Sequence, residues 1–388
     1  MYRLRAEHLY KVFGAGPDDG VRRLEAGAGR EELRESGTTA AVIDASFDVR
    51  EGEIFVVMGL SGSGKSTLLR MLNGLNPPTA GRVLFDGRDL TALSPGELRR
   101  VRSHGISMVF QHFALFPHRS VLQNAAYGLQ VQGVGRGERE ERAARALELT
   151  GLSGWGDSWP DELSGGMQQR VGLARALATD AGVLLMDESF SALDPLIRRD
   201  MQDQLLELQR GLKKTIVFIT HDLNEAMRLG DRVAVMRDGR IVQIGTPEDI
   251  LLRPADDYVS SFVHDVDRSR VLTAGTVMES PKRPDAGDCR CETVTRRTAL
   301  AEVLRVSTRV PHPVAVRGAD GDVVGVITKD RLLAALGAHD GSVTPCDSST
   351  APTAPTPPPA GAPANDGAPA NDGAPGVPSR QLKGAARA

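Results

Sequence analysis

Short runs of consecutive apolar residues, rich in branched side chains, recur in the part of the chain before residue 220. They occupy residues 54–58, 106–110, 183–186 and 215–219. A run of this length without polar alternation is typical of a strand that is buried on both faces. Patterns with helical spacing follow Lys65, Ser164, Asp194 and Asp222. The alternation of the two patterns predicts an α/β fold with a mostly parallel sheet.

Other segments depart from this alternation. Residues 4–13 predict a strand, whereas residues 15–40 are polar and charged and predict an insertion within the first sheet, with a short helical pattern near Leu24 to Leu33. Residues 112–162 are mainly helical in pattern and predict a separate lobe. The predicted divisions are an α/β domain (1–250), a helical connection (251–270), a small α+β domain with two β-like runs and a last helix (271–337), and a tail (338–388).

Composition narrows the classes of function. The formal net charge of -3 argues against nucleic-acid binding, which usually needs a basic surface. No apolar run approaches the roughly 20 residues that span a bilayer, and residues 1–8 lack the apolar stretch of a signal peptide, so a cytoplasmic location is expected. Cys289, Cys291 and Cys346 are too few for a four-ligand zinc site. The tail is rich in Pro, Ala and Gly, a composition that predicts disorder.

Residues 59–67, Gly-Leu-Ser-Gly-Ser-Gly-Lys-Ser-Thr, form a complete Walker A pattern between a predicted strand and a predicted helix. Its glycines let backbone N–H groups curl round phosphates, and the helix N-terminus adds the positive end of its dipole. Lys65 supplies a cation for the β- and γ-phosphates, and Ser66 offers a hydroxyl to Mg²⁺. A Gly/Ser-rich turn before a helix is the less favoured alternative. The residues expected to bind ATP here are Gly59, Ser61, Gly62, Ser63, Gly64, Lys65, Ser66 and Thr67.

The apolar run at residues 183–186 ends in Asp187 and Glu188, which is the Walker B pattern. Asp187 is expected to hold Mg²⁺, directly or through water, and Glu188 to orient the attacking water. Taken alone, an apolar run that ends in two acidic residues is an ordinary strand end. The Walker A pattern earlier in the chain favours the ATPase interpretation.

Residues 164–170, Ser-Gly-Gly-Met-Gln-Gln-Arg, open a predicted helix shortly before the Walker B run. Ser164, Gly165 and Gly166, with Gln168 beside them, are expected to form a second backbone cradle for phosphate. The alternative is a serine N-cap followed by glycines. In this position the segment resembles the signature motif of ABC-transporter nucleotide-binding domains. The resemblance covers residues 4–250 and implies a P-loop ABC-ATPase cassette with an antiparallel β subdomain and a helical lobe.

This resemblance implies functions for further residues. Gln111 matches the Q-loop glutamine that reaches Mg²⁺ or the lytic water, and His221 matches the switch histidine at the γ-phosphate. Together with Lys65 and Glu188 they form the implied catalytic set. Asp194 matches the D-loop, which crosses to a partner subunit.

The same resemblance implies how the nucleotide is enclosed. Phe13 is the expected aromatic that stacks on adenine, and Tyr10 is the competing choice. In the family two chains bind head to tail, so that Ser164 of one copy covers the ATP that Lys65 of the other copy holds. A homodimer is therefore expected.

Longer stretches resemble the ATPase subunits of glycine betaine/L-proline (quaternary amine) importers, namely residues 58–67, 108–118 and 190–201, and the insertion itself. The resemblance implies uptake of glycine betaine, proline betaine, proline, carnitine or choline in osmoprotection. It also implies an integral-membrane permease and an extracytoplasmic solute-binding protein as partners, with this chain peripheral at the cytoplasmic face of the inner membrane. Ser189 stands where Ala or Pro is expected, and no loss of activity is expected from it.

Alternative functions remain. One is the ATPase subunit of an importer for another solute, such as methionine or a polyamine, against which the insertion and the small C-terminal domain argue. Another is a non-transport ABC ATPase, although those usually carry two cassettes in one chain or a long coiled coil. A P-loop kinase or GTPase has no place for residues 164–169 or His221.

Residues 271–337 resemble a CBS domain, with the segment 325–330 at its strand-to-helix junction. The resemblance implies that Thr328 and Asp330 contact a nucleotide, and that the unit regulates transport through ionic strength or an adenine nucleotide. A plain strand followed by an N-capped helix is the alternative. CBS modules normally occur in tandem pairs, so a single copy implies pairing between two chains or a degenerate site.

Overall fold

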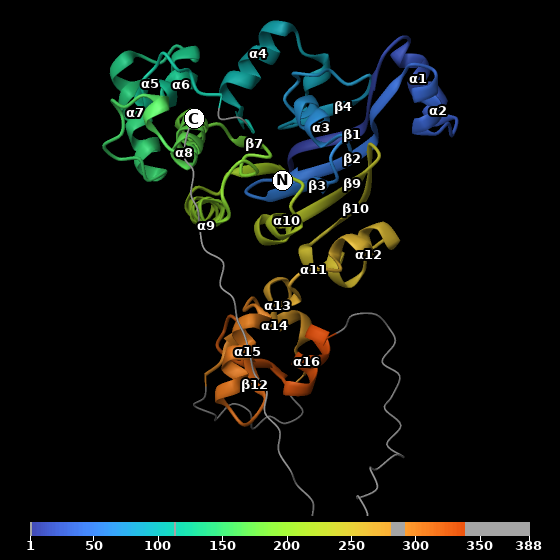
Figure 1. Cartoon of the computed structure of the whole chain (residues 1–388), viewed down its shortest axis with the longest axis vertical. Helices are drawn as coiled ribbons and strands as arrows, with labels where there is room; N and C mark the ends of the chain where they lie inside the picture. Colours follow the sequence, from blue (N-terminus) through green and yellow to red (C-terminus); the bar gives the residue numbers. More distant parts are fainter. Residues whose placement is uncertain (1, 112–113, 281–291, 338–388) are drawn as a thin grey trace, which may run out of the picture. The chain divides into compact units, whose positions relative to one another are not determined.

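The computed structural model of the chain describes residues 2–111, 114–280 and 292–337 (Figure 1). The tail and the three cysteines considered above lie outside the described residues. Among the described residues, no helix combines the length and the apolar character needed to cross a bilayer.

A six-stranded sheet with the order β10-β9-β3-β8-β7-β6 forms the centre of the first 250 residues. Its strands are β3 (Ile54–Gly59), β6 (Ile106–Val109), β7 (Val183–Asp187), β8 (Thr215–Thr220), β9 (Arg232–Arg237) and β10 (Arg240–Gly245). Neighbouring strands pair in parallel except β10, which pairs antiparallel with β9. Every residue of β3, β7 and β8 is buried, as the uninterrupted apolar runs predicted.

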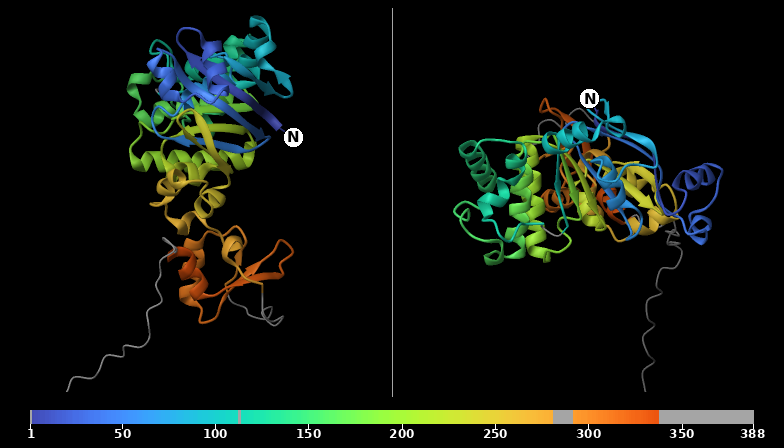
Figure 2. Two further views of the ribbon diagram at one scale, coloured as in Figure 1. Left: turned by 90° about the vertical axis from the view of Figure 1, so that its right-hand side faces the viewer. Right: turned by 90° about the horizontal axis from the view of Figure 1, so that it is seen from above.

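Helices cover both faces of this sheet (Figure 2). One face packs against α8 (Gly165–Ala178), α9 (Pro195–Leu212) and α10 (Leu223–Leu229). The other face packs against α3 (Lys65–Leu72) and a second sheet. Because side chains of a strand alternate between the two faces, Val56 joins the first core while Phe55 joins the second. Phe55 stacks there on Phe47, with ring centroids 5.0 Å apart.

The second sheet is antiparallel, in the order β2-β1-β4-β5. It contains β1 (Tyr2–Phe13), β2 (Thr39–Arg50), β4 (Ala80–Phe85) and β5 (Arg88–Asp89), followed by η1 (Leu90–Ala92) and α4 (Pro95–His104). The predicted insertion between β1 and β2 forms two short helices, α1 (Pro17–Glu25) and α2 (Arg30–Glu35), so the single helical pattern expected near Leu24 to Leu33 is in fact broken in the middle.

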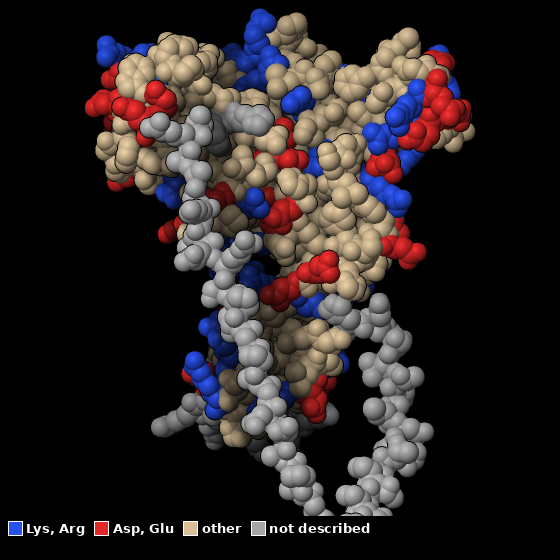
Figure 3. Space-filling model, in the orientation of Figure 1, with Lys and Arg blue, Asp and Glu red and all other residues tan. Residues whose placement is uncertain are grey.

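The insertion has a small core of its own, built from Tyr10, Val21, Leu24 and Leu33. Acidic and basic side chains intermix on its surface, whereas positive charge gathers over α4 (Figure 3). The ion pair between Arg34 and Glu31 is one of those on the insertion surface.

The predicted helical lobe contains α5 (Val121–Ala125), α6 (Tyr127–Val131), α7 (Arg136–Leu149) and η2 (Pro160–Glu162). Helix α8 completes its core, because Val171, Ala174 and Ala178 pack into the lobe while Leu173 packs against the sheet. The lobe core therefore extends past residue 162.

In the region of the predicted helical connection, the chain continues through α11 (Pro247–Leu252), α12 (Asp257–Val263) and α13 (Arg268–Val271). The following segment contains α14 (Ala274–Val277), β11 (Val294–Thr295), α15 (Leu300–Arg309), β12 (Val314–Arg317), β13 (Val323–Ile327) and α16 (Lys329–Gly337). Strands β12 and β13 and helix α16 match the two β-like runs and the last helix expected from the sequence. Strand β11 pairs in parallel with β12 and was not predicted.

Candidate functional site

The Walker A residues form the loop between β3 and α3, and glycine is required there by close backbone contacts. Gly59 and Gly64 both have positive φ angles, of 154° and 102°. A Cβ atom on Gly59 would lie 2.3 Å from the carbonyl oxygen of Met236, and one on Gly64 would lie 2.2 Å from that of Ala41. The loop is therefore packed against β9 and β2, and no residue with a side chain fits at these two positions.

Lys65 lies buried at the base of this loop. Its Nζ donates hydrogen bonds to the carbonyl oxygens of Gly59 (2.9 Å) and Leu60 (3.1 Å), and lies 3.8 Å from Oε1 of Glu188. Burial lowers the pKa of Lys65, and the neighbouring carboxylates of Glu188 and Asp187 oppose that shift. The ammonium group is thus held next to the loop amides, where phosphate oxygens would be bound.

Ser66 and Asp187 bring two oxygen donors together across the sheet. The Ser66 hydroxyl donates to Oδ1 of Asp187 at 2.9 Å, at the carboxyl end of β7. Burial raises the pKa of Asp187, while the hydrogen bond from Ser66 acts in the opposite direction. One carboxylate and one hydroxyl suit Mg²⁺, which keeps most of its shell for water and phosphate oxygens. The donor set therefore fits the metal expected from the sequence.

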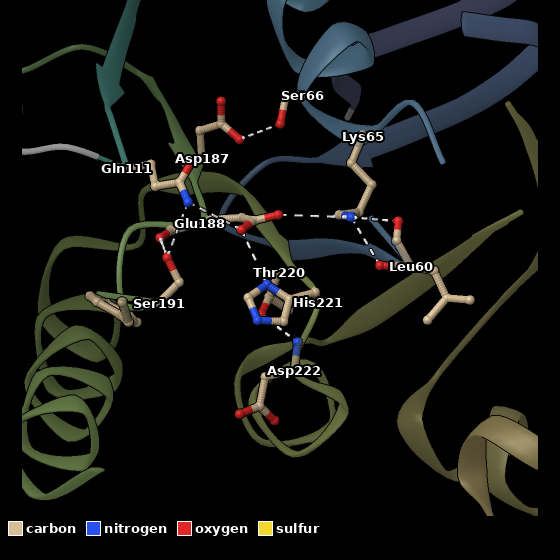
Figure 4. A network of polar contacts seen from close by, with 12 residues as sticks. Leu60, Lys65, Ser66, Gln111, Asp187, Glu188, Ser191, Thr220, His221 and Asp222 are labelled. Carbon is tan, nitrogen blue, oxygen red and sulfur yellow. Dashed lines mark hydrogen bonds and ion pairs between the residues drawn. The ribbon is translucent and has the colours of Figure 1, made fainter. Parts of the chain in front are cut away.

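Glu188 is the centre of a polar network (Figure 4). It follows β7 with a φ of 44°, an uncommon left-handed conformation, and its amide donates to the carbonyl of Ile219 on β8. Its Oε2 lies 3.1 Å from Nδ1 of His221 and 3.5 Å from Nε2 of Gln111. The carboxylate thus contacts three of the residues that the sequence placed in the catalytic set, since Lys65 approaches its other oxygen.

Gln111 lies on the side of the site that Glu188 occupies. Its amide contacts Glu188 and the hydroxyl of Ser191, both at 3.5 Å, whereas Ser66 and Asp187 pair with each other. Gln111 is thus linked to Glu188, the residue expected to orient the lytic water, rather than to Ser66 or Asp187.

The signature segment and the D-loop begin helices. The hydroxyl of Ser164 accepts from the amide of Met167, and Asp194 accepts from the amides of Leu196 and Ile197. Ser164 is therefore a helix N-cap, as the alternative interpretation proposed, and Gly165 stays exposed at the helix N-terminus. The two interpretations are compatible, because the backbone amides and dipole of such a terminus can receive an anion.

Gln168 and Gly166 hold this segment in place. Nε2 of Gln168 donates to the carbonyl of Pro160 at 2.8 Å and to that of Leu163 at 3.2 Å. A Cβ on Gly166 would lie 2.6 Å from Cγ2 of Ile197, so α8 packs closely on α9 at this point. In this structure Gln168 supports the signature loop.

The two aromatic candidates for adenine stacking differ in exposure. Phe13 is 43% exposed at the end of β1, with Nζ of Lys11 5.1 Å from the centre of its ring, whereas Tyr10 is 8% exposed. Tyr10 belongs to the core of the insertion. Phe13 is therefore the one of the two with a ring face available to a base.

Sequence reasoning missed Arg198, which links two loops of the site. Its guanidinium donates to the carbonyls of Phe190, Ser191 and Leu193 and to Oδ2 of Asp222, which follows His221. Nothing in the sequence marks Arg198, because it sits on an otherwise ordinary polar face of α9. A second missed residue, Arg30 of the insertion, reaches the carbonyl of Gly62 in the Walker A loop.

The junction between β13 and α16 was the candidate nucleotide contact of the C-terminal segment. Thr328 accepts a hydrogen bond from the amide of Arg331 at 3.2 Å, so it caps α16. Asp330 lies in the first turn of that helix. This geometry matches the alternative of a strand followed by an N-capped helix.

Comparisons with known proteins agree on one family. Residues 42–191 match the model of the ABC transporter family. The chain is 53% identical to the glycine betaine transport ATP-binding protein OpuAA of Bacillus subtilis, over 78% of this chain and 73% of that protein. It is 48% identical to the glycine betaine/proline betaine transport ATP-binding protein ProV of Salmonella typhimurium, over 87% of this chain and 84% of that protein.

A solved structure with a similar fold is the dimeric post-hydrolysis state of the ATP-binding cassette MJ0796 bound to ADP and Pi. Its TM-score is 0.53 at 31% identity, and the match covers 63% of this chain and 98% of that one.

Proposed function

Because this chain belongs to the family of ABC transporter ATP-binding subunits, we propose that it hydrolyses ATP to energise an importer of quaternary-amine compatible solutes. The solute class includes glycine betaine, proline betaine, proline, carnitine and choline. Two observations support it: relatives named for glycine betaine transport are 48–56% identical to this chain over most of its length, and the chain carries the insertion at residues 15–40.

The cluster around Glu188 carries the catalytic part of the proposal. Lys65 binds the phosphates of ATP together with the loop amides, and Ser66 and Asp187 hold Mg²⁺, which neutralises charge on the phosphate oxygens when bound. Glu188 orients and polarises the attacking water, and His221 and Gln111 hold that carboxylate in place through contacts of 3.1 Å and 3.5 Å. Phe13 provides the surface on which adenine stacks.

A single chain contributes two separate parts of a nucleotide site. We place the Walker loop of one copy opposite the exposed N-terminus of α8 in a second copy, so that Ser164, Gly165 and Gly166 cover the γ-phosphate. Asp194 lies at the start of α9, next to this face of α8. The solved structure with a similar fold is dimeric, which supports a homodimer.

A groove beside the Q-loop is the proposed docking surface for the membrane permease. Its volume is about 750 Å³ and its lining is mainly apolar. Residues that line it include Leu75, Met108, Phe110, Phe116, Tyr127 and Val131. Exposed apolar surface of this kind is typical of a protein interface, and Phe110 connects it directly to Gln111. The assembled complex then holds the chain at the cytoplasmic face of the membrane, with a solute-binding protein on the other side.

We also propose the division of the chain into the cassette (1–250), the helical connection (251–270), a single CBS-like regulatory unit (271–337) and a disordered tail (338–388). The support for the regulatory unit is its sequence resemblance and its β12-β13-α16 segment. Because Thr328 caps a helix, it is a weaker candidate for contact with a nucleotide. The proposal of a regulatory unit does not depend on that contact.

The test is ATP hydrolysis by the chain reconstituted with its permease and binding protein in proteoliposomes. Glycine betaine or another quaternary amine should stimulate hydrolysis, whereas methionine and spermidine should not. Stimulation by methionine or spermidine alone would assign the chain to the alternative importer class. ATP binding without hydrolysis under any solute would contradict the proposed catalytic site.

Glu188→Gln tests the catalytic residue itself. We expect turnover to fall by a factor of about a hundred or more, the range that a positioned base contributes, while ATP binding and the closed dimer persist because Lys65 and Ser66 are intact. Glu207→Gln, at an exposed position on α9, is the matched control and should hydrolyse ATP normally. Wild-type turnover in Glu188→Gln would show that another group orients the water.

A further inference from the structure

The insertion contacts the Walker A loop directly through one side chain. Arg30 is the first residue of α2, and its side chain is 28% exposed. One nitrogen of its guanidinium, Nη2, donates to the carbonyl oxygen of Gly62 at 3.1 Å. The other, Nη1, lies 3.3 Å from Oδ1 of Asp238. A residue outside all the nucleotide-binding motifs thus holds the loop that binds phosphate.

The turn between β9 and β10 completes this arrangement from the same side. Asp238 and Gly239 form the turn, with φ angles of 50° and 84°. The amide of Gly239 donates to the carbonyl of Ser63 at 3.0 Å, and its own carbonyl accepts from the amide of Ile43 at 2.8 Å. Two successive carbonyls of the loop, those of Gly62 and Ser63, are therefore bound from outside the loop.

Binding these carbonyls fixes the orientation of the loop amides. In a planar trans peptide, the C=O of one residue and the N–H of the next point in opposite directions. When Arg30 holds the carbonyl of Gly62 outward, the amide of Ser63 must point into the loop. That amide donates to the carbonyl of Leu60 at 3.2 Å, on the inner side. Inward-pointing amides are the groups that bind phosphate in such a loop.

Apart from the hydrogen bond of the Ser63 amide to Leu60, the peptide that Arg30 holds has no close packing on its glycine side. Gly62 is exposed with a φ of 78°, and a Cβ atom there would meet nothing within 4 Å. A glycine in open space samples many backbone conformations, so its ordering costs more entropy than that of other residues. The contrast with Gly59 and Gly64, which are confined by close backbone contacts, makes Gly62 the point where an external restraint has the largest effect.

We propose that Arg30 is a positioning residue of the nucleotide site, which holds the Gly62–Ser63 peptide in the orientation that binds phosphate. The inference rests on the proposed ATP-binding function of the loop. The guanidinium is anchored by Asp238, so the insertion and the β9–β10 turn together set the conformation of the Walker A loop. The insertion is thereby part of the nucleotide site.

The experiment compares the affinity for ATP, with Mg²⁺, of the full chain and of Arg30→Ala, by isothermal titration calorimetry. We expect the dissociation constant to rise about fivefold, the upper range for a partly exposed charged contact. In steady-state hydrolysis KM should rise by a similar factor while kcat changes less than twofold, because Arg30 does not touch the reacting atoms. Arg30→Lys should lie between the two, since a lysine keeps the charge but cannot bond Gly62 and Asp238 in a fork.

Arg34→Ala is the matched control, because Arg34 lies on the same helix, is 75% exposed and pairs with Glu31 of the insertion. It should bind ATP as the unsubstituted chain does. If Arg34→Ala weakens ATP binding as much as Arg30→Ala does, the effect comes from the loss of a positive charge on α2, and the inference is wrong. Unchanged affinity in Arg30→Ala would also overturn it. So would a lower Tm accompanied by a fall in kcat with KM unchanged. Failure of the unsubstituted chain itself to bind ATP would instead contradict the proposed function.

Discussion

Arg198 offers the most direct test of how the loops of the site are held together. It lies on α9 with a side chain 29% exposed, and it bonds three carbonyls of the segment after Glu188, at 3.2 Å for Phe190, 3.3 Å for Ser191 and 3.2 Å for Leu193. It also bonds Oδ2 of Asp222 at 3.3 Å. Arg198→Ala removes all four contacts and leaves the proposed catalytic residues unchanged.

The magnitude follows from these contacts. Each hydrogen bond contributes about 1 kcal/mol net, and the exposed ion pair with Asp222 adds less than about 1 kcal/mol. Because the Arg198 side chain is 29% exposed and water can enter where it is removed, we take about half of the sum, or roughly 2 kcal/mol. That corresponds to a Tm lower by about 2–3 °C for a chain of this size.

The same segment positions Glu188, since Ser191 donates to the carbonyl of Glu188 through both its amide (3.1 Å) and its hydroxyl (2.8 Å). If the same 2 kcal/mol is added to the activation free energy of hydrolysis, kcat falls by a factor of about 30. The affinity for ATP should stay the same, because the Walker loop is untouched.

Thermal unfolding and steady-state hydrolysis measure the two effects separately. Arg199→Ala, at the exposed neighbouring position, removes the same charge and should change neither. A lower Tm with kcat within twofold of normal would show that Arg198 stabilises α9 without positioning Glu188. If both Tm and kcat are unchanged, Arg198 neither stabilises the fold nor positions Glu188.

Two further predictions address the hydroxyl beside Glu188 and the C-terminal segment. The Oγ of Ser189 is buried and has no hydrogen-bond partner among the described residues. Ser189→Ala should raise Tm by about 1–4 °C, because an unsatisfied buried hydroxyl costs about 1–3 kcal/mol. Ser107→Ala is the contrasting variant and should lower Tm, because the Ser107 hydroxyl lies 2.6 Å from that of Thr179. A lower Tm in Ser189→Ala would show instead that the Ser189 hydroxyl has a hydrogen-bond partner. Truncation after residue 270 should leave solute-stimulated hydrolysis intact but abolish its control by ionic strength; retained control in the reconstituted transporter would contradict regulation by this segment.

The sequence predicts the central sheet well for a physical reason. A strand buried on both faces needs apolar side chains at every position, and residues 54–58 satisfy that requirement without interruption. The glycines that have close backbone neighbours can also be recognised in the sequence, because Gly59 and Gly64 stand at a fixed spacing before Lys65. Both signals are local, so they can be recognised along the chain.

Contacts between distant segments leave no such local signal. Arg30 and Gly62 are 32 positions apart, and nothing in the polar insertion distinguishes Arg30 from Arg34 until α2 is placed beside the loop. The double role of α8 is hidden in the same way, because Leu173 and Ala174 are adjacent in sequence yet belong to two cores. Strand β11 has only two residues, too few for alternation to be visible.

The geometry of the site follows from the register of three neighbouring strands. Lys65 follows β3, His221 follows β8 and Glu188 follows β7, and these strands are adjacent in the order β3-β8-β7. Met58 pairs with Thr220, and Asp187 pairs with Ile219, so each of the three strands ends about one residue from the end of its neighbour.

A slip of one residue would move a strand end by about 3.3 Å and turn its side chains to the other face. The contacts of Glu188 with Lys65 at 3.8 Å and with His221 at 3.1 Å would not survive such a shift. The apolar residues that fix the register, although they lie outside the proposed ATP site, therefore position the carboxylate of Glu188 as surely as its polar neighbours do.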